Sequence, residues 1–337
     1  MSKIKINLVK LQNVINFIIL TLKNKLRYFS VYLYYKNNIE KIARYKNQII
    51  CIVCDNRISN PTYGDFLYFA YLARYFVLKG IKVKFIFLED NNKKWKKYLP
   101  DKEIINFKKE QIILINKIGK IEKKNIYFST YKDLLKIKSN KCKIIFKDKV
   151  FSNIQIFDRL LDFLNIVISS ENKKFLQKFL LNKKEFNTPK KILQIKPYIS
   201  WHLRYNKKWG NYNNSEQEIK VIFNKLNSKF KNKKIIIISD YDGCNFAKKI
   251  LKKNKNIYYS KDVTTNFFED MILLVNSDFY FQYKAGGVYN VALFSTVPYK
   301  VIAFPSPFNE AWSKEKFVSW QQKNQFREKK NISLNKL

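Results

Sequence analysis

The stretch QIICIVCDNRISNPTYGDFLYFAYLARYFVLKGIKVKFIF, residues 48–87, decides the fold. It begins with a continuous run of mostly β-branched side chains over 48–54, which predicts a strand buried on both faces. After a turn-forming cluster, Gly64 and Asp65 open a segment with helical periodicity that ends before Gly80, a residue suited to the end of a helix. Residues 81–87 predict the next strand. The stretch is therefore a strand–helix–strand unit with parallel strands.

The same alternation continues along the chain. Further strands are expected at 125–129, 143–146, 198–203, 234–239, 256–259, 279–283 and 299–304. Helices are expected at 131–137, 154–166, 171–181, 215–230, 244–253, 266–275 and 287–294, and Ser215 with Glu218 forms a capping box at the start of one of them. Repeated units of this kind predict an α/β fold with two doubly wound parallel sheets facing across a cleft.

The domain organisation follows from breaks in this pattern. A polar, proline-bounded stretch at 182–191 separates the two halves, so we expect domains at 46–190 and 191–337, the second with a terminal helix.

Residues 1–45 form a basic N-terminal segment. Its apolar core at 14–22 is shorter than the roughly 20 residues that span a bilayer and lacks a cleavage site for a signal peptide. Either an amphipathic helix on an anionic membrane or a helix packed on its own domain fits this segment.

Composition excludes several classes of protein. Hydrophobic residues make up 46% of the 337 residues and aromatic residues 16%, which excludes disorder for most of the chain. The four cysteines are scattered, so we expect neither a disulfide framework nor a zinc site, and a cytoplasmic location fits. His202 is the only histidine, which excludes a metal site built from several imidazoles. We therefore expect no metal and no cofactor.

The net charge of +40 is a possible signature of a nucleic-acid-binding protein. The charge is nearly all lysine, spread among asparagine and apolar residues, whereas sequence readout depends on arginine and planar amides. A solvated lysine-rich surface explains the charge best, an anionic membrane surface comes next, and nucleic acid is the least favoured partner.

Candidate site residues follow the strands of the second half, because ligands of open α/β sheets bind beyond the carboxyl ends of the strands. His202 and Arg204 alternate on one strand, so the imidazole and the guanidinium point the same way and could meet a phosphate. Gly286 and Gly287 lie beside Lys284 before a helix, either as a phosphate cradle or as a plain tight turn.

The sequence leaves two roles open for each of two further carboxylates, Asp240 in the second half and Asp65 in the first. Ser239 and Asp240 follow the next strand, and Asp240 either accepts a nucleotide hydroxyl or caps the following helix. In the first half, Gly64 permits close approach of a ligand. Asp65 is either a general base on an acceptor hydroxyl or a helix cap.

These motifs resemble those of GT-B glycosyltransferases. More narrowly, His-x-Arg at 202–204, Ser-Asp at 239–240, the helix Glu-Asp-Met-Ile-Leu-Leu at 269–274 and the small-residue turn at 285–287 resemble the fucosyltransferase-like superfamily, with its protein O-fucosyltransferases and bacterial α-1,2 and α-1,6 fucosyltransferases. The resemblance covers about residues 198–304. The chain departs from that family at 205–207 and in having Gly286 and Gly287 instead of two serines.

The resemblance implies a GT-B-like fold and the transfer of a sugar, fucose in the narrow family, from a nucleoside-diphosphate sugar to a hydroxyl acceptor in surface-glycan synthesis. Because few carboxylates cluster near the candidate diphosphate residues, we expect the transfer to be metal-independent. The first domain would hold a glycan or lipid-linked acceptor and the second the donor. The candidate catalytic residues are Asp65, His202 and Arg204. The candidate donor-binding residues are Gly64, Arg204, Ser239, Asp240, Asp270, Lys284, Gly286, Gly287 and Asn290. Of these, the resemblance itself implies Arg204, Ser239, Asp240, Asp270, Gly286 and Gly287. The enzyme would be cytoplasmic and peripheral on the inner membrane face. The alternatives are a basic polyanion-binding protein and an inactive GT-B-like module.

Overall fold

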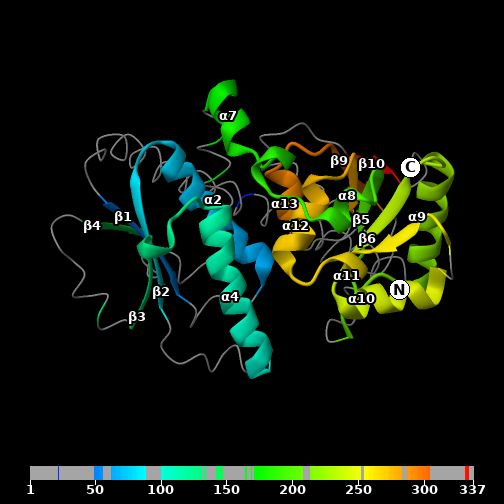
Figure 1. The fold of residues 1–337 in the computed structure, drawn as a ribbon, viewed down its shortest axis with the longest axis horizontal. Coiled ribbons are helices and arrows are strands. Elements are labelled where there is room, and N and C mark those ends of the chain that lie inside the picture. The colour runs from blue at the N-terminus through cyan, green and yellow to red at the C-terminus, as the bar shows by residue number, and fades with distance from the viewer. Residues whose placement is uncertain are drawn as a thin grey trace, which may run out of the picture.

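The computed structural model describes two parallel sheets and most of the helices around them (Figure 1). The described residues are 22, 49–55, 62–88, 100–130, 133, 142–146, 164, 168, 171–207, 213–251, 254–282, 287–303 and 331–333. The predicted segment 1–45 lies outside them except for Leu22, and the predicted terminal helix falls on residues that are not described. The predicted helices at 131–137 and 154–166 also lie outside them, apart from Asp133 and Leu164.

The first sheet has four parallel strands in the order β3-β2-β1-β4. They are β1 (Ile49–Asp55), β2 (Lys82–Leu88), β3 (Ile126–Ser129) and β4 (Cys142–Phe146). β1 lies inside the sheet and is buried from Ile50 to Asp55, which is why its sequence is apolar without interruption. All four strands were predicted to within one residue.

Two long helices accompany this sheet. α2 (Tyr63–Leu78) follows β1 and is buried from Phe66 to Phe76, and Gly80 has a positive φ of 76° just beyond its end, as expected for a residue that terminates a helix. α4 (Asp101–Lys117) was not predicted. It buries a stripe at 104, 107, 111, 114 and 115, a helical spacing.

The second sheet has six parallel strands in the order β10-β9-β8-β5-β6-β7. They are β5 (Tyr198–His202), β6 (Lys234–Ile238), β7 (Ile257–Tyr259), β8 (Phe279–Gln282), β9 (Tyr299–Ala303) and β10 (Asn331–Ser333). Its helices are α9 (Glu216–Lys229), α10 (Tyr241–Leu251), α11 (Ser260–Val263), α12 (Phe267–Val275) and α13 (Gly287–Leu293). The predicted capping box of α9 is confirmed, with Ser215 and Glu218 bonding reciprocally. β10 and the four-residue α11 were not predicted.

The strand orders identify the fold class. Counted from its first strand, each sheet begins 3-2-1-4, and the second completes the order 3-2-1-4-5-6 of a Rossmann-like sheet. The predicted α/β class with two parallel Rossmann-like sheets is confirmed, and the GT-B-like arrangement of the two domains across a cleft stays a prediction. The two sheets lie on either side of the predicted boundary at 190, and the exact domain limits stay a prediction.

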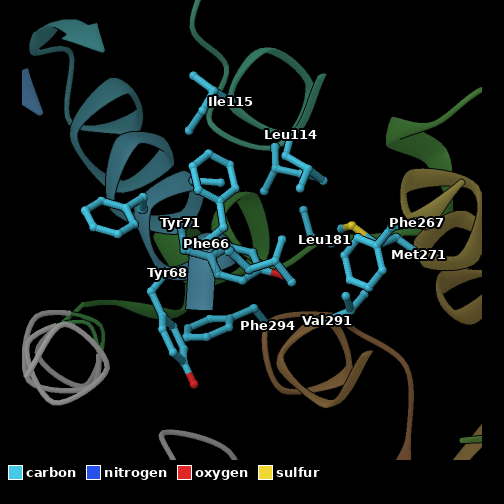
Figure 2. Close-up of a cluster of buried hydrophobic side chains, with 14 of the residues drawn as sticks. Phe66, Tyr68, Tyr71, Leu114, Ile115, Leu181, Phe267, Met271, Val291 and Phe294 are labelled. Carbon is cyan, nitrogen blue, oxygen red and sulfur yellow. The ribbon is translucent and has the colours of Figure 1, made fainter. Parts of the chain in front are cut away.

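The domains share one hydrophobic core. Helices α2 and α4 of the first domain pack against α12 and α13 of the second, and side chains from all four helices meet in one cluster (Figure 2). The ring centroids of Tyr71 in α2 and Phe294 just after α13 are 4.1 Å apart. At the other end of the contact, Tyr63 stacks on Phe267 at 4.4 Å with the rings nearly parallel. The contact between the domains is therefore apolar and aromatic.

A buried arginine ties α2 to the connection between the domains. This connection includes α7 (Lys173–Phe179), the 3-10 helix η3 (Lys183–Glu185) and the short α8 (Lys190–Leu193). Arg74 is 1% exposed and donates to the carbonyls of Phe179 and Lys178 at 2.7 Å each and to both carboxylate oxygens of Glu185 at 2.9 and 2.7 Å. Leu181 in turn donates its backbone N–H to Phe294 O at 2.8 Å, so this connection contacts both domains.

One cysteine differs from expectation. Cys51, inside β1, is disulfide-bonded. The scattered spacing of the four cysteines did not predict a bond, because separation in sequence does not show which cysteines meet in the fold.

Candidate functional site

The candidate site lies at the carboxyl ends of β5, β6 and β8. β5 pairs with β6 on one side and with β8 on the other, so the strand order reverses between β5 and β8. Ligands of open α/β sheets bind outside the carboxyl ends of the strands at such a switch point. His202 is the last residue of β5 and Gln282 is the last residue of β8, and the two are partners in the parallel register. The two side chains therefore border the switch point.

His202 and Gln282 lie on the same face of the sheet. Residues at alternate positions of a strand share a face, as do in-register partners on neighbouring strands. Tyr198 in β5, Ile238 in β6 and Tyr280 in β8 all belong to the core cluster shared with α12 and α13. His202 and Gln282 continue this face, on the side where α12 and α13 pack. Gln282 was not predicted as a site residue.

The imidazole of His202 is buried and neutral. The side chain is 7% exposed. Burial, and after it the positive charge of Arg204, lowers the pKa of His202 to about 3. Among the described residues, the buried Nδ1 atom has no hydrogen-bond partner. Arg204 is two residues further along the chain, and the predicted shared orientation of its side chain and the imidazole stays a prediction.

Arg204 is held by its backbone. Asn214 Oδ1 accepts a hydrogen bond from the Arg204 N–H at 2.8 Å, and the Asn214 N–H donates to the Arg204 carbonyl at 2.7 Å. Asn214 is 2% exposed, so the clamp is buried. Asn214 was not predicted, because nothing in a lysine- and asparagine-rich loop distinguishes it before the chain is folded.

The loop after β5 also reaches the loop after β6. Asn206 donates its backbone N–H to Asn213 Oδ1 at 2.9 Å and accepts from Asn213 Nδ2 at 2.8 Å. Its side chain donates to Asp240 Oδ2 at 3.1 Å. This pairing connects the loop that carries Arg204 to the predicted residue Asp240.

Ser239 and Asp240 are both engaged within the protein. Ser239 is buried and donates its hydroxyl to the Leu203 carbonyl at 2.7 Å, next to Arg204 in sequence. Asp240 Oδ1 accepts from the Gly243 N–H at 2.8 Å, so it caps the first turn of α10, as one of the two alternatives expected. A direct contact of either residue with a nucleotide stays a prediction.

Asp270 forms a buried ion pair with Lys261, which lies just after the carboxyl end of β7. Its Oδ2 accepts from Lys261 Nζ at 2.5 Å and its Oδ1 from Thr264 Oγ1 at 2.6 Å, and both members of the pair are less than 10% exposed. Burial raises the pKa of Asp270, and the charge of Lys261 opposes that rise. The carboxylate fastens α11 to α12.

The predicted residues of the first domain begin α2, next to α12. Gly64 is buried in the first turn of α2, and the side chain of Asp65 lies outside the described residues. Glu110 of α4 accepts from the Phe267 N–H at 3.0 Å, and Phe267 stacks on Tyr63. Burial raises the pKa of Glu110. The start of α2 is thus placed against the start of α12.

The remaining predicted residues are described only in part. Lys284 and Gly286 lie outside the described residues, Gly287 is the first residue of α13, and Asn290 lies within α13 with its side chain not described. The structure therefore brings together His202, Arg204, Ser239 and Asp240, and the predicted roles of all these residues stay predictions.

The described residues form neither a candidate metal site nor a candidate membrane-spanning helix. No three or more of the histidine, cysteine, aspartate and glutamate side chains that are described gather in a group able to hold a metal ion. None of the described helices combines the length and apolar character needed to cross a membrane.

Comparisons with known proteins were made by family, by sequence and by structure. No family model and no curated protein matches the chain. The crystal structure of a glycosyl transferase family 9 protein from Veillonella parvula is 9% identical, with 85% of each chain covered and a TM-score of 0.39. The S. aureus MnaA–UDP co-structure is 10% identical, with 75% of this chain and 79% of that chain covered and a TM-score of 0.35. Both TM-scores are below 0.5, so neither likeness carries an argument about this chain.

Proposed function

We propose that this protein is a glycosyltransferase that binds a nucleoside-diphosphate sugar at the carboxyl ends of β5, β6 and β8. The observation that carries the proposal is the position of Arg204. A buried clamp from Asn214 fixes its backbone beside a neutral, buried imidazole at the switch point of a Rossmann-like sheet. A guanidinium at this position would match the oxygens of a diphosphate.

The chemistry requires stabilisation of the departing diphosphate. Sugar transfer develops negative charge on the leaving group, and preorganised donors aimed at that charge lower the barrier. Arg204 supplies a permanent cation at one side of this edge, and Lys284 with the backbone at Gly286 and Gly287 would supply more. With a pKa of about 3, His202 is a poor general base near neutral pH. The proposal therefore gives the role of base toward the acceptor hydroxyl to Asp65.

We further propose a sugar donor, an acceptor and a cellular location for this enzyme. The donor is a GDP-sugar, with fucose as the first sugar to test, and the transfer needs no metal. The acceptor is a glycan or a lipid-linked precursor, and the enzyme works in the cytoplasm at the inner membrane face, attached through residues 1–45. These parts rest on the sequence motifs and on the basic N-terminal segment.

Calorimetry of the purified protein with GDP and with UDP tests the donor site. We expect the Arg204→Ala variant to bind the preferred nucleotide roughly 10- to 100-fold more weakly, because hydrogen bonds to charged groups are worth about 1.5–3 kcal/mol. Lys249→Ala, which removes one exposed positive charge from α10, is the matched control and should bind as the wild type does. Equal affinities of wild type and Arg204→Ala would remove the diphosphate assignment.

The same experiment separates the proposal from polyanion binding, which the net charge of +40 favours. A polyanion-binding protein would bind nucleic acid tightly at physiological salt with a steep salt dependence and would bind neither GDP nor UDP. That result would replace the glycosyltransferase proposal.

Liposome sedimentation tests the membrane part of the proposal. Deleting residues 1–36 should release the protein from anionic vesicles. A truncated protein that still sediments would show that this segment is not the anchor.

A further inference from the structure

One carboxylate joins the two domains at the point where helix α12 begins. Helix α4 of the first domain packs against α12 of the second (Figure 1), and Glu110 of α4 accepts a hydrogen bond from the Phe267 N–H at 3.0 Å. Phe267 is the first residue of α12. The first N–H groups of a helix have no partner within the helix, so other groups must bind them. Glu110 therefore caps a helix of the other domain.

This cap adds to the one that α12 has from its own chain. Asn266 precedes the helix, and its side chain accepts from the Glu269 N–H at 2.9 Å. A carboxylate is also favoured at the start of a helix, because the helix dipole is positive there. The first domain thus supplies an acceptor that complements the cap of the second domain.

Tyr63 connects the same contact to the start of α2. It is the first residue of α2, and its ring stacks on Phe267 at 4.4 Å and packs against Phe107 of α4 at 4.8 Å. Burial raises the pKa of Tyr63, so the phenol keeps its proton and donates its hydrogen bond to Glu110. Tyr63, Glu110 and Phe267 therefore join three helices of the two domains.

The surroundings of Glu110 oppose its charge as well as support it. Burial, the largest effect, raises the pKa of Glu110. The hydrogen bonds from Phe267 and Tyr63 lower it, and so does the charge of Lys261. Asp270, which is itself paired with Lys261, raises it. The two hydrogen bonds are thus what distinguishes Glu110 from an apolar residue at the same place in the interface.

We propose that Glu110 is a positioning residue that holds the first turn of α2 against the second domain. Asp65 belongs to this turn, two residues after Tyr63, so the contact fixes where its backbone lies relative to the strand ends of the second sheet. The inference deepens the proposed function and rests on it for the role of Asp65 as the base. The contact between the helices does not depend on that role.

Two substitutions separate the reach of the Glu110 side chain from its charge. Glu110→Asp keeps the charge but is one methylene shorter, so its carboxylate should fall short of the Phe267 N–H. Glu110→Gln keeps the length and an oxygen that accepts from this N–H, and its NH2 group can donate to the Tyr63 hydroxyl. The contact should therefore be lost in the first variant and kept in the second.

Hydrogen–deuterium exchange followed by mass spectrometry measures the contact in the full chain. In Glu110→Asp, peptides that span Tyr63 and Phe267 should exchange at least about 10-fold faster than in the wild type, because a hydrogen bond to a charged group is lost. Glu110→Gln should stay within about threefold of the wild type, since a neutral acceptor binds more weakly.

Glu122→Ala is the matched control for these measurements. It removes a carboxylate of the same domain that is exposed and paired with Lys124, so both peptides should exchange as in the wild type. Wild-type exchange in Glu110→Asp, or equally fast exchange in Glu110→Gln and Glu110→Asp, would overturn the proposal.

Hydrolysis of GDP-fucose gives a second readout that a loss of stability alone would not reproduce. Water takes the place of the acceptor: its oxygen bonds to the sugar, the bond from the sugar to the diphosphate breaks, and one proton passes to Asp65. We expect Glu110→Asp to lower kcat about 10- to 100-fold, because the base is displaced, with the KM for GDP-fucose unchanged. Glu110→Gln should keep the wild-type kcat.

The two readouts separate this inference from the proposed function. A wild type that binds neither GDP nor UDP and does not turn over GDP-fucose counts against the proposed function and not against Glu110. The exchange measurements then decide by themselves whether Glu110 holds α2. Faster exchange in Glu110→Asp with an unchanged kcat would overturn the role of Glu110 in placing Asp65.

Discussion

The folded protein should lose stability through His202 as the pH falls below about 6.5. Its pKa is about 3 in the folded state, while an exposed imidazole in the unfolded chain has a pKa of about 6.5. Between these values the unfolded chain binds a proton that the folded protein does not, so unfolding is favoured as the pH falls. At pH 5.0 the unfolded imidazole is protonated about 30 to 1 while the folded one is neutral, which lowers the free energy of unfolding by about 2 kcal/mol relative to pH 7.5.

The assay is urea unfolding followed by tryptophan fluorescence at pH 5.0, 6.0 and 7.5 and constant salt. The wild type is compared with His202→Gln, because buried acids such as Glu110 and Asp270 have raised pKa values and contribute in the opposite direction. The difference between the two proteins should therefore shrink by about 2 kcal/mol from pH 7.5 to pH 5.0. Lys249→Ala should follow the wild type. If the free energies of unfolding of the wild type and of His202→Gln change with pH in parallel, the imidazole is not buried in its neutral form.

Three further substitutions test the contacts that hold the site in place. Arg74→Met should lower the free energy of unfolding in urea by about 1–3 kcal/mol, because it leaves the carbonyls of Phe179 and Lys178 without their side-chain donor while Glu185 keeps Lys120 and Asn182; an unchanged free energy would contradict this. Lys261→Met should cost about 3–5 kcal/mol by leaving the Asp270 carboxylate buried without its cation, and unchanged stability in the same assay would show that the pair is not formed. Gly243→Ala should cost about 1–3 kcal/mol, since its Cβ would lie 1.9 Å from Ser239 Oγ, and adding Ser239→Ala should recover part of the loss; full stability of the single variant would contradict the close contact.

The sequence predicted the strands well because their signal is local. Both sheets are parallel and covered by helices, so their inner strands are apolar runs bounded by turn residues, as in Ile49–Asp55. The helix α4 was missed although its signal is present. The buried positions of Asp101–Lys117 have helical spacing, but lysines interrupt them and the run Ile112–Ile115 also suits a strand. β10 was missed because it joins the sheet after a long separation in sequence.

For the candidate site, the sequence predicted only which residues follow the strands and which residues alternate on one strand face. Alternation predicts that His202 and Arg204 share a face, and the charge of Arg204 contributes to the lowered pKa of His202. Gln282 could not be found from sequence, because its position at the switch point depends on being the register partner of His202 across a gap of 80 residues. Asp270 follows a family-like motif, yet the structure uses it in an ion pair with Lys261. A motif names a residue type at a position, whereas the partners of that residue are decided by the fold.

The asparagines in the loop after β5 form specific hydrogen bonds with the backbone. An asparagine-rich composition therefore does not by itself indicate a surface without structural roles. The side-chain amide of asparagine contains one donor group and one acceptor, like a peptide group, so it can satisfy backbone atoms where a chain leaves a strand. Asn214 does this for the N–H of Arg204, and Asn213 does it for both backbone groups of Asn206. An aspartate at 213 could accept but not donate, and a lysine could donate but not accept. At position 213 the backbone of Asn206 therefore uses both groups of the side-chain amide, whereas at position 214 only the side-chain oxygen bonds to Arg204.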